Sequence, residues 1–411
     1  MNRAAVRLDV AAVNATIIIS AVVVSTVLTG CPPTPFDAVD VGEAVIATGT
    51  TPNSVMPLRC GGRARLLVVS SGEARLERVD PAGLADVASV FLGVGSTPWD
   101  VAIAIAGDST DTARAVVTLP GHHSLALVDP CATPMRLITE VISPSPIDVE
   151  PAVTMRDPAD VDNDGVADVV VSRMTPRTPQ AVVAVGPSVL VVWANLLAYS
   201  TSSTEPMLSG PGLLTRFTVT GDGESLQETG RVVLPCENPG GLVAVTDDTV
   251  VVSCAGRFVV GVDGHRQQSP GGLVRVLTPA TGPLVVDGNV VLTDHTPGPI
   301  VWAKQELVTG DLLDGTVRAF DNATLVEQRS TAPTTTIDSV FALTVTVGDD
   351  VVAGWFSGRV QRSPLDNGPI RQLTDGPGRG LVDLACDDDG GYGLFSLSAE
   401  LVPFSFADGE P

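Results

Sequence analysis

The chain has 411 residues, of which 44% are hydrophobic, 17% charged and 4% aromatic. This composition excludes an intrinsically disordered chain and supplies enough apolar surface for a large packed core. Acidic residues outnumber Lys and Arg by 47 to 24, which gives a formal net charge of -23. Nucleic acid is therefore not expected as a partner, because phosphate binding depends on clustered basic groups.

The first 30 residues have the pattern of a signal peptide. Two arginines precede an apolar stretch over residues 10–28, which ends at Leu28-Thr29-Gly30-Cys31. An ordinary secretory signal or an uncleaved membrane anchor would explain the apolar stretch, but not the small pair and the cysteine at its end. The segment resembles the lipobox of bacterial lipoproteins. That resemblance implies a signal peptide over residues 1–30 and lipidation of Cys31.

A proline-rich tether follows the lipobox. Residues 31–44 include Pro32, Pro33 and Pro35, which prevent a regular helix, so we expect a spacer between the lipid and a folded domain. In lipoproteins an Asp directly after the lipidated cysteine favours retention in the inner membrane, whereas this chain has Pro32 at that position. The resemblance thus implies a cell-envelope protein anchored in the outer membrane, on either its periplasmic or its surface face.

Five further cysteines bear on the compartment. No two of them form a CxxC pair, so a zinc or redox role has no support from their spacing. Export permits disulfides, and the odd count leaves at least one thiol unpaired. We expect one or two bridges with unassigned connectivity among Cys60, Cys131, Cys236, Cys254 and Cys386.

From residue 45 onward, the apolar segments are short, β-branched and bounded by Gly, Pro and Asp, which is typical of strands. They recur in one order: an opening strand, an acidic turn, a second strand, a Gly-containing turn and a strand that ends near Asp. Three or four strands in a period of about 40 to 50 residues indicate a β-propeller. A β-sandwich array is the rival fold, but it would not require this order to repeat. Openings fall near residues 54, 98, 146, 239, 297, 338 and 380.

The segment from Pro98 to Asp129 resembles the YVTN and NHL repeats of bacterial propellers, and the resemblance covers most of residues 45–408. We therefore predict an all-β fold with a seven-bladed β-propeller over residues 45–411 and an insertion near 175–212. The 93 residues between Pro146 and Pro239 would also have room for an eighth blade.

An acidic loop carries the strongest chemical motif. Asp160, Asp162 and Asp164 alternate along the chain, Gly165 follows, and Asp168 comes three residues later. Ca²⁺ takes six to eight oxygen ligands, and this spacing wraps carboxylates around one point. The pattern predicts a structural Ca²⁺ site with ligands from the side chains of Asp160, Asp162, Asp164 and Asp168 and from the backbone carbonyl of Val166.

The loop differs from an EF-hand, because Val171 stands where that motif has a bidentate Glu and a strand-like run follows. It resembles the calcium loop of FG-GAP or VCBS repeats, which joins two strands of one blade in integrin-like propellers. An acidic turn without bound metal is the alternative interpretation.

The opening strands of propeller blades line the central channel. Asp100 and Asp148 occupy matched positions in two predicted openings, so we expect them to face a common channel mouth that binds a cation or a polar ligand. Capping of turns, or hydrogen bonds to a neighbouring blade, would explain the same residues.

Two functions fit these features. The first is a lipid-anchored extracytoplasmic propeller that acts as a binding or scaffold protein for a protein or glycan partner. The alternative is an extracytoplasmic hydrolase or lyase with its site at the channel mouth, where Asp383 would join Asp100 and Asp148. The sequence contains no Gly-x-Ser-x-Gly nucleophile motif, and its adjacent His122 and His123 fall at a predicted turn.

Overall fold

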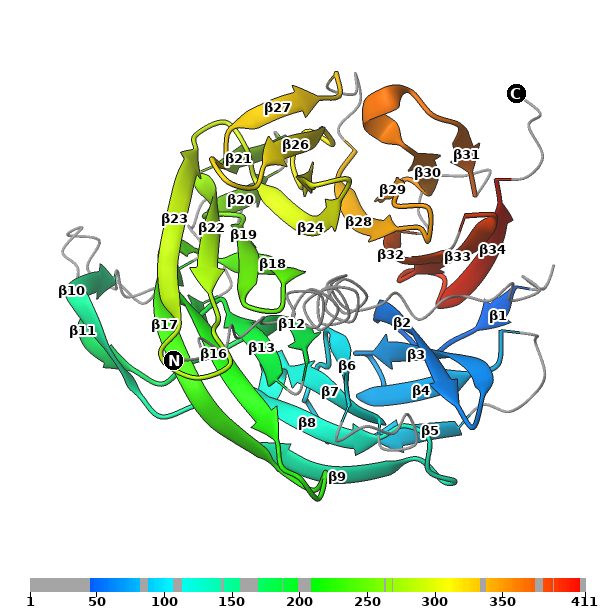
Figure 1. The fold of residues 1–411 in the computed structure, drawn as a ribbon, viewed down its shortest axis with the longest axis horizontal. Coiled ribbons are helices and arrows are strands. Elements are labelled where there is room, and N and C mark those ends of the chain that lie inside the picture. Colours follow the sequence, from blue (N-terminus) through cyan, green and yellow to red (C-terminus); the bar gives the residue numbers. More distant parts are fainter. Residues whose placement is uncertain are drawn as a thin grey trace, which may run out of the picture.

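The chain folds into a ring of seven four-stranded antiparallel sheets, a seven-bladed β-propeller (Figure 1). The innermost strands of successive blades contact one another in a closed cycle. The computed structural model describes residues 45–81, 88–105, 113–141, 144–155, 169–186, 188–198, 208–261, 264–267, 269–332, 338–373, 380–386 and 388–406. Within these ranges the only helical segments are two short 3-10 turns, η2 (Pro120–His122) and η3 (Pro364–Asp366).

The blades are numbered along the chain, and the strands of each are named from the innermost outward. Blade 1 contains β2 (Pro52–Cys60), β3 (Arg63–Ser70), β4 (Arg75–Val79) and β5 (Ala88–Phe91). Blade 2 contains β6 (Val101–Ile105), β7 (Ala113–Leu119), β8 (Ser124–Asp129) and β9 (Arg136–Val141). Blade 3 contains β12 (Pro179–Val185), β13 (Ser188–Trp193), β16 (Pro211–Val219) and β17 (Leu226–Glu237). Blade 4 contains β18 (Pro239–Thr246), β19 (Thr249–Cys254), β22 (Gly271–Leu277) and β23 (Val285–Leu292).

Three more blades complete the ring. Blade 5 contains β24 (Pro297–Ala303), β25 (Glu306–Asp311), β26 (Val317–Asp321) and β27 (Glu327–Ser330). Blade 6 contains β28 (Val340–Val345), β29 (Val351–Trp355), β30 (Arg359–Arg362) and β31 (Ile370–Gln372). Blade 7 contains β32 (Leu381–Cys386), β33 (Gly390–Phe395), β34 (Glu400–Ser405) and β1 (Ile46–Ala47).

The two ends of the domain meet in blade 7. Its outermost strand is β1, from the start of the domain, which pairs antiparallel with β34 so that Ile46 lies opposite Leu401. Ile46 also packs against the core between blades 7 and 1. This pairing closes the ring with backbone hydrogen bonds and covers an edge of β34 that would otherwise be exposed.

Packing between blades explains the short apolar runs of the sequence. Every residue of β7 and of β33, the second strands of their blades, is buried. A second strand packs against neighbouring blades on both of its faces, so it needs apolar residues at consecutive positions rather than at alternate ones. Outer strands face solvent on one side, and β23 accordingly alternates between exposed and partly buried residues. Burial of apolar surface, at about 25 cal/mol per Å², holds adjacent blades together.

The predicted opening near residue 146 is not the start of a blade. There β10 (Ile147–Met155) pairs only with β11 (Val169–Met174), and blade 3 opens at Pro179. Within the region expected as an insertion, 175–212, β12 and β13 belong to blade 3, whereas β14 (Leu196–Ala198) and β15 (Leu208–Ser209) form a separate hairpin. A third extra hairpin joins β20 (Phe258–Gly261) to β21 (Gly264–Gln267).

Two disulfides lie within the described ranges. One joins Cys60, at the end of β2, to Cys131, in the connection between β8 and β9, and so links blades 1 and 2. The other joins Cys236 to Cys254, and the buried Cys386 belongs to neither bridge. Among the described residues, no helix is long and apolar enough to cross a membrane.

Candidate functional site

The three extra hairpins found among the described residues all emerge from the same end of the ring. The first strand of each blade starts at one end of the ring, and the four strands alternate in direction, so the chain is back at that end after the second and the fourth strand. Two kinds of connection therefore share that end. These are the connection into each innermost strand and the connection between the second and third strands, and we call this end the entry face. The hairpin β10–β11 precedes an innermost strand, whereas β14–β15 and β20–β21 each lie between a second and a third strand. The three hairpins therefore extend the entry face beside blades 3 and 4.

Asp100 is located at the entry face, directly before β6. One of its carboxylate oxygens accepts hydrogen bonds from the Val101 backbone N–H at 2.8 Å and the Ser54 hydroxyl at 3.1 Å. The other oxygen accepts the backbone N–H of Val182, in β12, at 2.9 Å. The carboxylate therefore joins the innermost strands of blades 1, 2 and 3.

Asp383 repeats this arrangement in β32. One oxygen accepts the N–H of the following residue, Leu384, at 2.9 Å, and the other accepts the N–H of Val55, in β2, at 2.7 Å. In both blades the carboxylate thus binds its own strand and the innermost strand of the next blade. Asp383 performs this role where blade 7 meets blade 1.

Burial raises the pKa of both carboxyls. Each side chain keeps some accessible surface, but each lies deep in the ring, where protein replaces most of the surrounding water. This desolvation raises the pKa of Asp100 to about 6 and that of Asp383 to about 7, against the lowering effect of their hydrogen bonds. The charge of Asp100 raises the pKa of Asp383 further.

The structure does not bring Asp100 and Asp148 together. Asp148 is in β10, where its side chain is 82% exposed and lies 4.0 Å from the guanidinium of Arg173. The group that interacts with Asp100 at the axis is Asp383, from an innermost strand 283 positions further along the chain. The hydrogen bonds of Asp100 and Asp383 match the alternative interpretation of the sequence, in which such residues bind a neighbouring blade.

Several predicted positions lie outside the described residues. Cys31 is one, and the calcium-loop residues Asp160, Asp162, Asp164, Val166 and Asp168 are the others. The described strands nevertheless locate that loop in the fold, because Met155 of β10 pairs with Val169 of β11. The loop therefore connects the two strands of an extra hairpin rather than two strands of a blade.

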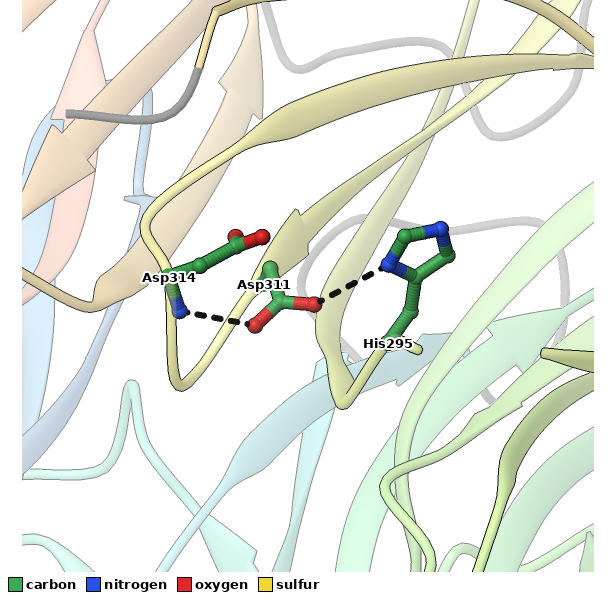
Figure 2. A group of neighbouring side chains, drawn as sticks. All are labelled: His295, Asp311 and Asp314. Carbon is green, nitrogen blue, oxygen red and sulfur yellow. Dashed lines mark hydrogen bonds and ion pairs between the residues drawn. The ribbon is translucent and has the colours of Figure 1, made fainter. Parts of the chain in front are cut away.

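Sequence reasoning did not single out the cluster formed by His295, Asp311 and Asp314. His295 is in the connection from β23 to β24, and the two aspartates are at the start of the turn from β25 to β26 (Figure 2). Both segments belong to the entry face. Their separation along the chain concealed the cluster, although the run Asp311-Leu312-Leu313-Asp314-Gly315 resembles an acidic turn.

The entry face also exposes apolar side chains. Val94 and Trp99, between β5 and β6, are 86% and 45% exposed, and Leu397, between β33 and β34, is 63% exposed. Phe356 follows β29, and its ring centroid lies 5.2 Å from that of Phe341, which is also partly exposed. Exposed aromatic groups among polar loops are typical of contact surfaces for other molecules.

Comparison with known proteins shows the fold. No family model and no curated protein matches the chain. Among solved structures, it is similar to virginiamycin B lyase from Staphylococcus aureus, at 9% identity and a TM-score of 0.57, over 88% of this chain and 98% of the lyase. It is also similar to the β-propeller domain of Myceliophteria thermophila Cps50 (Swd1), at 9% identity and a TM-score of 0.55, over 89% and 99% of the two chains. A third similar structure is YCF48 bound to D1 peptide, at 12% identity and a TM-score of 0.50, over 92% and 99%.

Proposed function

We propose that this protein is a lipid-anchored, extracytoplasmic propeller that binds a protein or glycan partner through its entry face. The anchor is Cys31, the tether is residues 31–44, and the membrane is the outer membrane of the cell envelope. This part of the proposal rests on the lipobox pattern and the prolines that follow it.

The disulfides support export. Disulfides persist in oxidising compartments and are rare in the reducing cytosol. The disulfides Cys60–Cys131 and Cys236–Cys254 are both formed, and Cys386 is the fifth cysteine of the domain, which belongs to neither. An extracytoplasmic location provides the conditions in which both bridges would form and last.

The main support for a binding role is that the extra hairpins and several exposed aromatic side chains lie on one face. The three extra hairpins, the exposed Trp99 and the Phe341–Phe356 pair all belong to the entry face. A propeller needs none of these hairpins to close its ring, so they increase the area and variety of one surface. Crosslinking from that face in cell envelopes tests this role, with partner capture expected from the entry face and not from the opposite face.

The hydrolase or lyase alternative has weaker support. Propellers host both binding and catalysis, and the similar structures include a lyase and a peptide-bound protein. A catalytic channel mouth would need several carboxyls that converge on a substrate. Instead, Asp100 and Asp383 hydrogen-bond to neighbouring strands, and Asp148 is at the surface of a separate hairpin.

A structural Ca²⁺ ion in the acidic loop is also part of the proposal. Calcium would neutralise carboxylates that otherwise repel one another and would fix the connection between β10 and β11. Because this hairpin lies outside the seven blades, the stabilisation should be local.

We expect calcium to protect the hairpin β10–β11 from proteolysis while the melting temperature of the ring stays unchanged, because the hairpin opens locally. At a calcium concentration 100 times the dissociation constant, local opening and therefore cleavage within residues 156–168 should slow by about 100-fold. Limited proteolysis with calcium or with chelator measures this effect. Asp162→Asn should abolish the protection, and Asp247→Asn, in another acidic turn, should retain it. Equal cleavage rates in calcium and chelator would reject the site.

A further inference from the structure

His295 presents a buried ring nitrogen to two carboxylates. Its Nδ1 lies 3.8 Å from Oδ2 of Asp311 and has no hydrogen-bond partner, although the atom is buried (Figure 2). Ligand atoms of His295, Asp311 and Asp314 all lie within 4.8 Å of one another. A buried polar atom without a partner needs a physical explanation.

A third carboxylate lies beside the other ring nitrogen of His295. Oε2 of Glu327, in β27, lies 3.9 Å from Nε2 of His295. The imidazole thus lies between two carboxylates, with Asp311 beside Nδ1 and Glu327 beside Nε2. In the tautomer with its proton on Nε2, the lone pair of Nδ1 is directed at Asp311. In that tautomer the lone pair and the carboxylate of Asp311 repel each other unless a cation lies between them. Metal-bound histidines commonly have this arrangement, with a carboxylate on the outer ring nitrogen.

Asp311 is held rigidly for such a role. Its Oδ1 accepts the backbone N–H groups of Leu313 at 2.7 Å and Asp314 at 3.1 Å. Within the described part of the chain, its Oδ2 accepts one hydrogen bond, from the backbone N–H of Thr296 at 2.9 Å. A carboxylate oxygen has two acceptor positions, so Oδ2 keeps one for a cation.

The local charge fits a divalent ion. Asp311, Asp314 and Glu327 contribute three negative charges, and Arg318 contributes one positive charge at 3.6 Å from Asp314 and 3.4 Å from Glu327. These four side chains leave two negative charges uncompensated. A dication would balance them.

We propose that His295, Asp311 and Asp314 bind a transition-metal dication of the Zn²⁺ or Mn²⁺ type on the entry face, between blades 4 and 5. One imidazole nitrogen with carboxylate oxygens suits such ions, whereas Ca²⁺ takes oxygen ligands only. The site is distinct from the acidic loop of residues 157–168 and goes beyond the proposed binding role. Gln267 of β21 donates a hydrogen bond to the His295 carbonyl at 2.7 Å, so the ion would also fix the base of the hairpin β20–β21.

Zinc titration of the full chain, purified in detergent and freed of metal by chelator, tests this site. Millimolar Ca²⁺ is kept in all samples so that the acidic loop does not compete for zinc. Wild-type protein should bind about one equivalent of Zn²⁺, and His295→Ala and Asp314→Asn should each weaken binding by about 10- to 100-fold or more, the range typical of losing groups that support a metal. His123→Ala, a histidine of the same face outside the cluster, should bind like wild type.

Co²⁺ in place of Zn²⁺ supplies a direct readout in folded wild-type protein, because its visible absorption reports nitrogen and oxygen ligands. His295→Gln keeps a polar side chain of similar reach and replaces His295→Ala if the smaller residue disturbs folding. Absence of stoichiometric binding by wild type would overturn the proposal. Binding by the His295 variants equal to that of wild type would overturn it as well, because the ion would then lie elsewhere.

Discussion

The ring should lose stability as the pH rises from about 4 to about 7, and Asp383→Asn should remove much of this dependence. The folded-state pKa values of Asp100 and Asp383 are raised to about 6 and about 7, from 3.8 in the absence of the fold. In this window the folded chain retains protons that the unfolded chain releases. The free energy of unfolding therefore falls as the pH rises and levels off above about pH 7, by an amount on the order of a few kcal/mol.

Thermal or denaturant unfolding between about pH 4 and pH 8 measures this profile for wild type and Asp383→Asn. Asn cannot accept hydrogen bonds from both Val55 and Leu384, so the variant should be less stable at acidic pH while its profile is flatter. All other titratable groups are common to both proteins, so the difference between the profiles reports Asp383 together with its coupling to Asp100. Asp148→Asn, at an exposed aspartate, is the matched control and should follow wild type. A profile of Asp383→Asn parallel to that of wild type would contradict the assignment.

Removing the bridge between blades 1 and 2 should have an effect of similar size. Cys60 and Cys131 are 71 positions apart, and a bridge that closes a loop of this length stabilises a folded chain by about 4 kcal/mol through restriction of the unfolded state. The double variant Cys60→Ala and Cys131→Ala should lose about that much in denaturant unfolding. The pair Cys236 and Cys254, 18 positions apart, should contribute about 3 kcal/mol by the same argument.

Reducing agent should reproduce both losses in wild-type protein and should have no further effect on a variant that lacks all four bridged cysteines. The two double variants serve as controls for each other, because each retains one bridge. Unfolding curves that are identical in oxidised and reduced wild type would show that the bridges do not constrain the chain.

The sequence predicts the propeller well because each blade repeats local chemistry. Pro52, Pro179, Pro239 and Pro297 all begin innermost strands, and acidic or Gly-containing turns separate the strands that follow. The prediction that a blade opens near residue 146 is wrong for a physical reason. Pro146-Ile147-Asp148-Val149 has the local pattern of an innermost strand. Membership of a blade is decided by hydrogen bonds to distant strands, and β10 pairs only with β11.

The same limit applies to the candidate sites. Asp100 and Asp148 share a local pattern, but Asp383 is the residue that acts like Asp100, because ring closure places blade 7 beside blade 1. His295 and Asp311 come from two different connections, and nothing in their spacing indicates that they meet. Local patterns singled out Asp100, whereas long-range strand order determined its partner Asp383 and brought His295 to Asp311.

Residue-specific photocrosslinking in intact cell envelopes tests the central claim, that an anchored propeller binds through its entry face. A photoreactive phenylalanine is placed at Trp99 or Leu397 on the entry face. At the opposite face it is placed at Val285 or Val347, whose exposures of 46% and 53% are comparable to the 45% and 63% of the first two. Cys31→Ser, which should release the protein from the membrane fraction, checks the anchor.

The account predicts that one partner, a protein or a glycan-bearing molecule, crosslinks to the membrane-bound protein from positions 99 and 397 and not from positions 285 and 347. Crosslinks of equal yield from both faces, or from the opposite face alone, would contradict it.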